Sequence, residues 1–398
     1  MTAVDRPRIG VALSGGGLRA AFYALGCLRY LAEADLLGEV CAVSCVSGGS
    51  LAAAALADRW QDVERAGLAG FLAHVDGPFR ATVTSRDLRR AWMGRAARNW
   101  LGGDRRGRGH VLGDVIGELY RTSELGALPA GPATIFTATD LATGRAFRMS
   151  RDFIGSYDFG YVAPPPLALG FAVAASAAFP GVFSPLELRS NGLGLKRPPE
   201  RLELVDGGVY DNMGIEWFQG WRPELRPEGA VEPDLLIVCN ASGSLGRVDA
   251  RFGGLRALAR EHKIQYAQML NVRIRWFVQD LLKERRRGLY LGIVGDPRRF
   301  KLADDTTPID PALYDGALPS VFVPALARMR TDLNRFTASE ADLLSYHGYW
   351  STHARFGSFH PAFAVPAPAW RDYADLSKDE TDTLIAEIAD GSHRAAYR

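Results

Sequence analysis

One stretch restricts the possible folds of this chain more than any other: residues 43–50, which read V-S-C-V-S-G-G-S. The apolar run Val40–Val43 enters it and predicts a short buried strand, and the small-residue run Leu51–Leu56 leaves it and predicts a helix. α/β hydrolases expose a nucleophilic serine on such a sharp strand-to-helix turn, where the residues two before and two after it must be small. Ser47 is therefore a candidate nucleophile, with Gly49 two positions later.

The match to the G-x-S-x-G pattern is incomplete, because Cys45 stands two residues before Ser47 where the pattern has glycine. Cysteine is small, so the turn can form with it. The alternative interpretation is a purely structural turn, since small residues also surround serines that carry out no chemistry. The stretch by itself leaves both interpretations open.

A glycine loop, Ser14–Arg19, comes earlier in the chain, between a predicted strand at Ile9–Leu13 and a predicted helix at Ala20–Ala34. Its three consecutive glycines leave several N–H groups at the positive end of a helix, where they can hold an anion or a developing oxyanion. The G-x-G-x-x-A spacing also suits a dinucleotide, but that fingerprint needs an acidic residue after the next strand, and Glu39 precedes it. An oxyanion hole for Ser47 and a plain tight turn are the other two interpretations.

The composition is that of a soluble globular protein, with 398 residues of which 47% are hydrophobic and 23% charged. The net charge of +2 is too small to favour a nucleic-acid partner. The four cysteines have no metal-ligand spacing, so we expect reduced thiols in an intracellular protein. No run of about 20 residues is apolar enough to span a bilayer. We therefore expect a cytoplasmic protein that can still be peripheral to a membrane.

Residues 60 to about 125 differ from the rest of the chain, because arginines crowd this segment and tryptophans interleave with them. We interpret it as a basic helical insertion. Its part from Arg86 to Leu101 is typical of a helix that lies on an anionic bilayer. The alternative is a solvated helix whose tryptophans pack on the domain. The arginines are Arg80, Arg86, Arg89, Arg90, Arg95, Arg98, Arg105, Arg106 and Arg108.

Predicted strands alternate with predicted helices along most of the chain. This favours an α/β fold with a mostly parallel sheet, covered on both faces and carrying reactive loops at the carboxyl ends of its strands. We expect one main domain over residues 1–360 and a Pro/Ala-rich segment with a C-terminal helix over 361–398. Further strands are predicted at Thr134–Ala138, its hairpin partner Arg145–Met149, Leu202–Val205, Leu235–Cys239 and Gly288–Val294, and further helices at Leu169–Ala178, Leu255–Lys283, Ser339–Tyr349 and Ser377–Ala389.

A catalytic serine needs a base to take its proton. None of the seven histidines follows a strand at a glycine turn, and the best of them, His347, lies within a predicted helix. Asp206 has a better setting, because the strand Leu202–Val205 delivers it directly into two glycines. A buried carboxylate can serve as a base. The alternative is an ordinary Asp–Gly turn.

Four motifs, taken in their order along the chain, resemble those of the patatin-like phospholipases. They are Gly15-Gly16-Gly17-x-Arg19, the Ser47 turn, Ala175-Ser176-x-x-x-Pro180-x-x-Phe183-x-Pro185, and Asp206-Gly207-Gly208. The resemblance covers roughly residues 8–215, with gaps at the basic insertion, and Cys45 departs from the family pattern.

This resemblance implies a three-layer α/β/α sandwich and a Ser–Asp dyad without histidine. Ser47 would attack an ester carbonyl, and Asp206 would take its proton and return it to the leaving alcohol. The substrate would be a phospholipid or another acyl ester, and neither a metal nor any other cofactor would be needed. Backbone N–H groups would hold the oxyanion, on a loop oriented by an arginine; the residues implied are Gly15, Gly16, Gly17 and Arg19.

Two other functions stay open on the same fold. One is a general carboxylesterase or thioesterase that acts on soluble acyl groups. The other is a binding protein that keeps the fold without turnover. The sequence does not indicate an oligomeric state.

Overall fold

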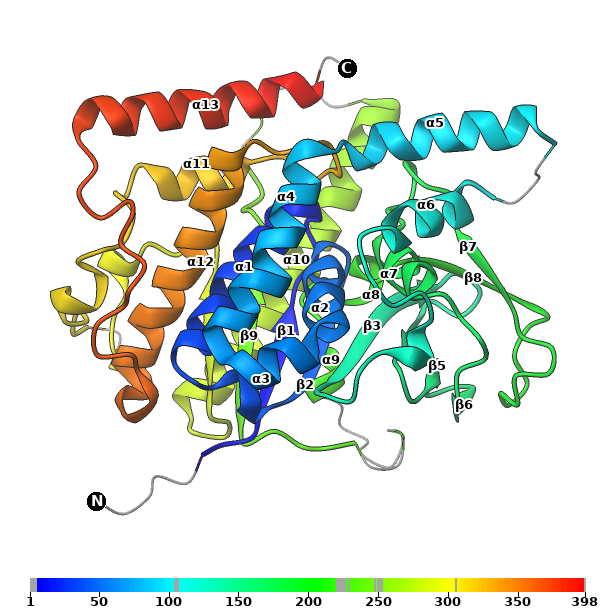
Figure 1. The fold of residues 1–398 in the computed structure, drawn as a ribbon, viewed down its shortest axis with the longest axis horizontal. Coiled ribbons are helices and arrows are strands. Elements are labelled where there is room, and N and C mark those ends of the chain that lie inside the picture. The colour runs from blue at the N-terminus through cyan, green and yellow to red at the C-terminus, as the bar shows by residue number, and fades with distance from the viewer. Residues whose placement is uncertain are drawn as a thin grey trace.

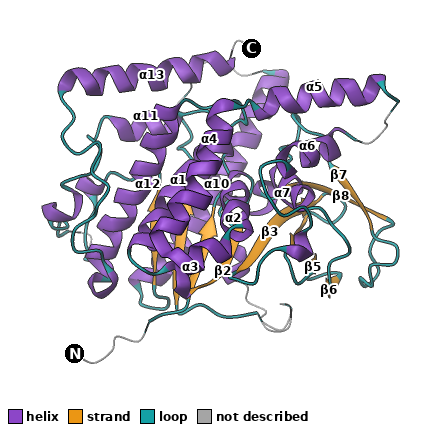
Figure 2. Ribbon diagram, viewed as in Figure 1, coloured by secondary structure: helices purple, strands orange, loops and turns teal. Residues whose placement is uncertain are grey.

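A ten-stranded sheet runs through the computed structural model and carries helices on both of its faces (Figure 1 and Figure 2). The structure describes residues 6–103, 107–219, 227, 230–246, 248, 253–304 and 306–396. Arg105 and Arg106 of the basic segment lie outside the described residues. None of the helices in the described ranges is both long and apolar enough to cross a membrane.

The strands form one continuous sheet with two kinds of pairing. They are β1 Ile9–Leu13, β2 Val40–Cys45, β3 Ala133–Asp140, β4 Arg145–Met149, β5 Ile154–Ser156, β6 Gly160–Val162, β7 Leu186–Arg189, β8 Arg201–Asp206, β9 Leu235–Asn240 and β10 Gly288–Gly292. The order is β10-β9-β1-β2-β3-β4-β5-β6, and β8 pairs with both β3 and β7. The five strands from β10 to β3 run parallel, and the pairings beyond β3 are antiparallel.

The helices lie on the two faces of this sheet and along one of its ends (Figure 1). They are α1 Gly17–Glu33, α2 Gly48–Asp58, α3 Trp60–Gly70, α4 Gly77–Ser85, α5 Leu88–Leu101, α6 Arg108–Gly117, α7 Leu169–Ala177, α8 Gly208–Asp211, α9 Glu216–Gln219, α10 Gly254–Leu282, α11 Phe322–Arg328, α12 Ala338–Phe359 and α13 Lys378–Ala396, with a π-helix at Phe71–Asp76.

Alternate residues of the central strands enter two separate cores, as the period of two along a strand requires. Val11 and Leu13 of β1 join the larger core, which also holds the buried faces of α1 and α12. Ala12 points to the other face, where Leu270 and Phe277 of α10 cover the sheet. Apolar residues on both faces of a strand are typical of a parallel sheet covered on both sides, and the predicted α/β class is confirmed.

Most predicted elements are present with small differences at their ends. The strand Ile9–Leu13 and the hairpin of β3 with β4 are confirmed. Helix α1 begins three residues before the predicted start, because Gly16, at φ 136°, serves as its N-cap and lets the helix start at Gly17. In the C-terminal segment, Ile388 of α13 is buried in the larger core. The division of the chain at residue 360 remains a prediction.

One edge of β3 is shared by two strands that approach each other end to end. Cys45, the last residue of β2, pairs with Phe136 of β3. Asp206, the last residue of β8, pairs with Ala138, two residues further along the same strand. Strand β4 also pairs with Phe136 and Ala138. It therefore lies along the opposite edge of β3, and β2 and β8 share the first edge. The two chain segments therefore meet where both strands end.

The basic segment of residues 60–125 contains α3 to α6, and the two tryptophans of α5 have opposite settings. Trp92 is only 7% exposed, donates to the carbonyl of Arg108 at 2.9 Å and packs edge-on against Phe183. Trp100 is 78% exposed, on the end of α5 that extends outward in Figure 1. The tryptophan that packs on the domain and the tryptophan that faces solvent thus lie on the same helix.

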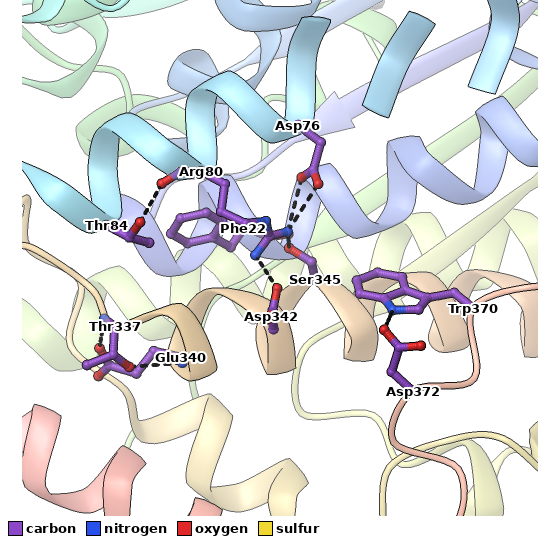
Figure 3. Close-up of polar contacts among 10 residues, drawn as sticks. All are labelled: Phe22, Asp76, Arg80, Thr84, Thr337, Glu340, Asp342, Ser345, Trp370 and Asp372. Carbon is purple, nitrogen blue, oxygen red and sulfur yellow. Dashed lines mark hydrogen bonds and ion pairs between the residues drawn. The ribbon is translucent and has the colours of Figure 1, made fainter. Parts of the chain in front are cut away.

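A partly buried arginine ties this segment to α12, as Figure 3 shows. Arg80 of α4 forms ion pairs with Asp76 at 3.1 Å and with Asp342 at 2.8 Å, and it donates to the Ser345 hydroxyl at 3.1 Å. Its guanidinium also lies over the ring of Phe22 in α1. These contacts fix α4 against the main domain, and α5 follows it after two residues.

Candidate active site

Ser47 lies on a sharp turn between β2 and α2, as the sequence predicts. Its φ of 50° and ψ of −117° are strained for a residue with a Cβ. The turn holds because the next two residues are glycines. A Cβ at Gly48 would lie 1.9 Å from the Gly17 carbonyl oxygen, and a Cβ at Gly49 would lie 2.5 Å from that of Leu13. The start of α2 is thereby packed directly on the glycine loop.

Cys45 is compatible with this turn despite its departure from the pattern. It is fully buried as the last residue of β2, and its thiol donates to the Ile135 carbonyl at 3.3 Å. Burial raises the pKa of the thiol to about 12. Cys45 is thus a neutral core residue that leaves the strained geometry of Ser47 intact.

Asp206 ends β8 with its carboxylate facing the Ser47 turn. It is 4% exposed, and its Oδ1 accepts from the Gly208 N–H at 2.7 Å. Burial raises its pKa to about 6, against the lowering effects of the Gly208 N–H and of the Ser47 side chain. The predicted nucleophile and base are therefore brought together, and the carboxylate has a pKa near neutrality.

Ser176 of α7 is central to the site, and no role was predicted for it beyond its place in a motif. The Ser47 N–H donates to its carbonyl oxygen and to its hydroxyl oxygen, each at 3.1 Å. The same hydroxyl donates to the Thr137 carbonyl at 2.7 Å and lies 2.9 Å from the Ser50 hydroxyl. The Ala-Ser sequence at the end of a small-residue helix, four residues before Pro180, was the available signal.

The predicted oxyanion donors on the glycine loop divide into two groups. The Gly15 N–H donates to the Asn212 carbonyl at 2.8 Å, so the prediction that this amide faces an oxyanion is corrected: the amide is already used to anchor the loop. The N–H groups of Gly16 and Gly17 have no partner among the described residues. Gly15 contributes by its small size instead, because a Cβ there would lie 3.1 Å from the Cβ of Ser47.

Arg19 is buried beneath the glycine loop, on the first turn of α1. Its guanidinium donates to the carbonyls of Ala327 and Met329, at 2.8 Å each, and burial lowers its pKa to about 10. It therefore does not face Ser47 as a donor but ties the loop to the chain after α11. The Asp332 carbonyl in that chain accepts from the Leu18 N–H at 3.3 Å. The Leu18 amide at the start of α1 is thus already used within the protein.

Asn212 is a further site residue, and none of the sequence motifs includes it. Its backbone carbonyl accepts a hydrogen bond from the Gly15 N–H, and its side-chain amide donates to the Ser242 hydroxyl at 2.9 Å. Its Oδ1 lies 2.3 Å from where a Gly15 Cβ would stand and 2.6 Å from where a Gly208 Cβ would stand. Its place six residues after Asp206, in the same glycine turn, was the signal.

No histidine of the described residues takes part in this arrangement. His347 is buried in α12 with its Nε2 2.8 Å from the Ile293 carbonyl, just beyond β10. Strand β10 lies at the far edge of the sheet, three strands from β2. His347 is thus separated from Ser47 by most of the parallel block, and Asp206 is the titratable side chain next to the serine.

Apolar side chains are exposed on the segments that follow the site residues. Phe179 and Val182 come after α7 and are about half exposed, and Val209 follows the Asp206 turn. The Asp206 N–H donates to the carbonyl of Ala178, directly before Phe179. The buried polar pair is therefore bordered by an apolar surface that solvent can reach.

Comparison with known proteins agrees with this fold. The family model of the patatin-like phospholipases matches residues 11–218, more than half of the 398 residues. No curated protein sequence matches the chain significantly. A structure of human GIVD cytosolic phospholipase A2 aligns with a TM-score of 0.50 at 13% identity, over 96% of this chain and 63% of that one.

A second structure of the human enzyme, in complex with the inhibitor methyl gamma-linolenyl fluorophosphonate and terbium chloride, aligns with the same TM-score at 15% identity, over 90% of this chain and 59% of that one. At such identities the likeness shows the fold alone, and this chain spans less than two thirds of the human enzyme's length. The strand–serine–helix turn on an α/β sheet and the family match lead to one conclusion. The chain belongs to the patatin-like phospholipase family, a family of lipid acyl hydrolases.

Proposed function

We propose that this protein is a lipid acyl hydrolase of the phospholipase A or lysophospholipase type, with Ser47 as nucleophile and Asp206 as base. One observation carries the proposal: the strained Ser47 turn and the buried Asp206 carboxylate meet end to end along one edge of β3. Membership of the family supports the same reaction class.

The reaction divides into two acyl transfers. The Ser47 hydroxyl attacks the ester carbonyl while Asp206 takes its proton, and the carbonyl oxygen becomes an oxyanion. The N–H groups of Gly16 and Gly17 hold that oxyanion, at the positive end of α1. The intermediate collapses with loss of the alcohol, which receives the proton from Asp206. Water then attacks the acyl-serine by the reverse sequence, releasing the carboxylic acid and restoring Ser47.

Asp206 can act without histidine because of its surroundings. A carboxylate of ordinary pKa is too weak a base for a serine hydroxyl, whereas burial brings the pKa of Asp206 to about 6, close to neutral pH. The Gly208 N–H fixes one of its oxygens. The other oxygen is thereby left to the serine.

The exposed apolar side chains beside the site favour a lipid substrate. Phe179, Val182 and Val209 border the buried pair, and an acyl chain entering the site would cover them. A general carboxylesterase or thioesterase would use the same Ser–Asp dyad on soluble acyl groups, and a binding protein would use neither residue as a reagent. The two experiments below separate these functions.

The first experiment is labelling with a fluorophosphonate, the class of inhibitor in the human enzyme complex. The wild type and a Ser50→Ala control should be labelled, since Ser50 is a buried serine in the same helix. Ser47→Ala should lose the label. A His347→Gln variant should keep it, because the mechanism contains no histidine. Label that persists on Ser47→Ala would refute the assignment.

The second experiment is a substrate comparison by mass spectrometry. Wild type should release fatty acid from phospholipid vesicles, and Asp206→Asn should not. Hydrolysis of short p-nitrophenyl esters with untouched vesicles would favour the soluble esterase. Absence of both labelling and turnover in the wild type would favour the binding protein.

A further inference from the structure

A cationic cavity of about 370 Å³ lies between the start of α5 and the chain that leads into α12. Gly391 of α13 closes another side, and α5 and α13 lie along the same edge of the molecule in Figure 1. None of the residues that line it belongs to the Ser47 site. The catalytic proposal therefore leaves this cavity without a role.

The charges lining the cavity are unequal, with four arginines against two carboxylates, Asp87 and Glu340. Glu340 is fully buried and paired with Arg330, and it also closes the capping box with Thr337 (Figure 3). Asp87 accepts from the Arg90 N–H as the N-cap of α5. Both carboxylates are thus already engaged in holding the walls in place.

Three guanidinium groups remain at the cavity: Arg89 and Arg90 on α5, and Arg335 on the facing chain. None of them has an ion-pair partner among the described residues. A further carboxylate, Asp332, lies 3.5 Å from the Arg330 side chain. Burial raises the pKa of Asp332, against the lowering effect of Arg330 and the smaller one of Arg89. Guanidinium groups on two facing walls match the several oxygens of a phosphate.

The outer side of the cavity continues into exposed apolar side chains of α5. Met93 lines the cavity and is 53% exposed, and it also lines a second hollow of about 1110 Å³ between α5 and α6. Beyond it, Trp100 and Leu101 are 78% and 77% exposed at the end of the helix. Tryptophan next to arginine is typical of the headgroup region of a bilayer. This continuity favours a membrane lipid over a free ion as the source of the phosphate.

We propose that the cavity of Arg89, Arg90 and Arg335 binds the phosphate of an anionic phospholipid, while Met93, Trp100 and Leu101 enter the headgroup region. In this role the cavity catalyses no reaction and only holds the protein on the bilayer. The inference therefore does not depend on whether Ser47 is the nucleophile.

The test is co-sedimentation with vesicles, in a Ser47→Ala background so that no lipid is consumed. Vesicles of phosphatidylcholine with phosphatidylglycerol should bind the protein, and pure phosphatidylcholine should bind it much less. Arg89→Gln with Arg335→Gln should weaken binding roughly 25-fold, since each arginine near an anionic surface contributes about fivefold. The matched control is Arg65→Gln with Arg299→Gln, two exposed arginines elsewhere, which should change binding less than about threefold.

Two further arms test the chemistry and the source. Arg89→Lys with Arg335→Lys should recover most of the binding, which shows that the loss reflects charge rather than misfolding. Titration with inorganic phosphate should show no saturable site at millimolar concentration. Equal vesicle binding by the Gln variant and wild type would overturn the proposal. Phosphate binding that is lost in the Gln variant while vesicle binding persists would overturn the membrane source.

Discussion

The Ser47 N–H donates to both oxygens of Ser176, its carbonyl and its hydroxyl, at 3.1 Å each. The same carbonyl accepts from the Gly207 N–H at 3.1 Å. One residue of α7 therefore holds the turn of the nucleophile and the turn of the base together. The distance between the Ser47 and Asp206 side chains therefore depends on Ser176.

Ser176→Ala should lower kcat more than it changes KM. The variant loses the hydroxyl bonds to Ser47, Ser50 and Thr137 but keeps the carbonyl bonds, so the elbow loosens without unfolding. We expect kcat on a soluble ester to fall roughly 10- to 100-fold. The matched control is Ser190→Ala, a buried serine bonded to two carbonyls in the β7–β8 connection, which should leave kcat unchanged. Equal kcat values for both variants would contradict the positioning role.

The pH dependence of kcat/KM should follow Asp206. Only the ionised carboxylate can take the serine proton, so activity should rise with pH and level off above the pKa of about 6. A pH–rate profile on a soluble ester measures this. His347→Gln should not shift the midpoint of the pH–rate profile. A wild-type midpoint near pH 4 would contradict the prediction, because it would show that the base is not buried.

Asp206→Asn should stabilise the protein at neutral pH. The pKa of Asp206 is raised from 3.8 to about 6, so the folded state binds the proton more tightly than the unfolded state does. The free energy of unfolding of the wild type therefore falls as the pH rises from about 4 to about 6. Two pKa units correspond to roughly 3 kcal/mol, which the variant should gain above pH 7 and not below pH 4.

Denaturant unfolding at both pH values measures this difference. Asp140→Asn is the control, because that buried carboxylate accepts from the Thr143 hydroxyl and N–H and its replacement should not stabilise the fold. A destabilised Asp206→Asn protein at pH 8 would contradict the prediction.

Gly48→Ala should disrupt the elbow through a direct clash. Its Cβ would stand 1.9 Å from the Gly17 carbonyl oxygen, and both segments are backbone, so neither can move freely. We expect a loss of more than about 2 kcal/mol in thermal or denaturant unfolding, together with the activity. Gly126→Ala, where a Cβ meets nothing within 4 Å, should stay within about 0.5 kcal/mol of wild type.

Local patterns predicted much of the site because they depend on residues close together in the chain. The glycines after Ser47 and the strand before Asp206 indicated a strained turn and a delivered carboxylate, and both are present. The single departure, Cys45, could not be judged from sequence, because its effect depends on whether a thiol fits the core against Ile135. The role of the basic segment was likewise undecided from the sequence, because periodicity does not show which tryptophan of α5 packs against the domain.

The sequence by itself determined the alternation of strands and helices, the position of the serine turn and the family. Only the tertiary structure decided how β8 pairs with β3. Strand β8 runs antiparallel to β3 on the same edge as β2, beyond the point where β2 ends at Cys45, and this places Asp206 beside Ser47. The tertiary structure also decided that the Gly15 amide is used by Asn212 and that Arg335 and Arg89 line the same cavity. The physical reason is that periodicity and turn chemistry act over a few residues, whereas strand order, register and charge pairing depend on segments far apart in the chain.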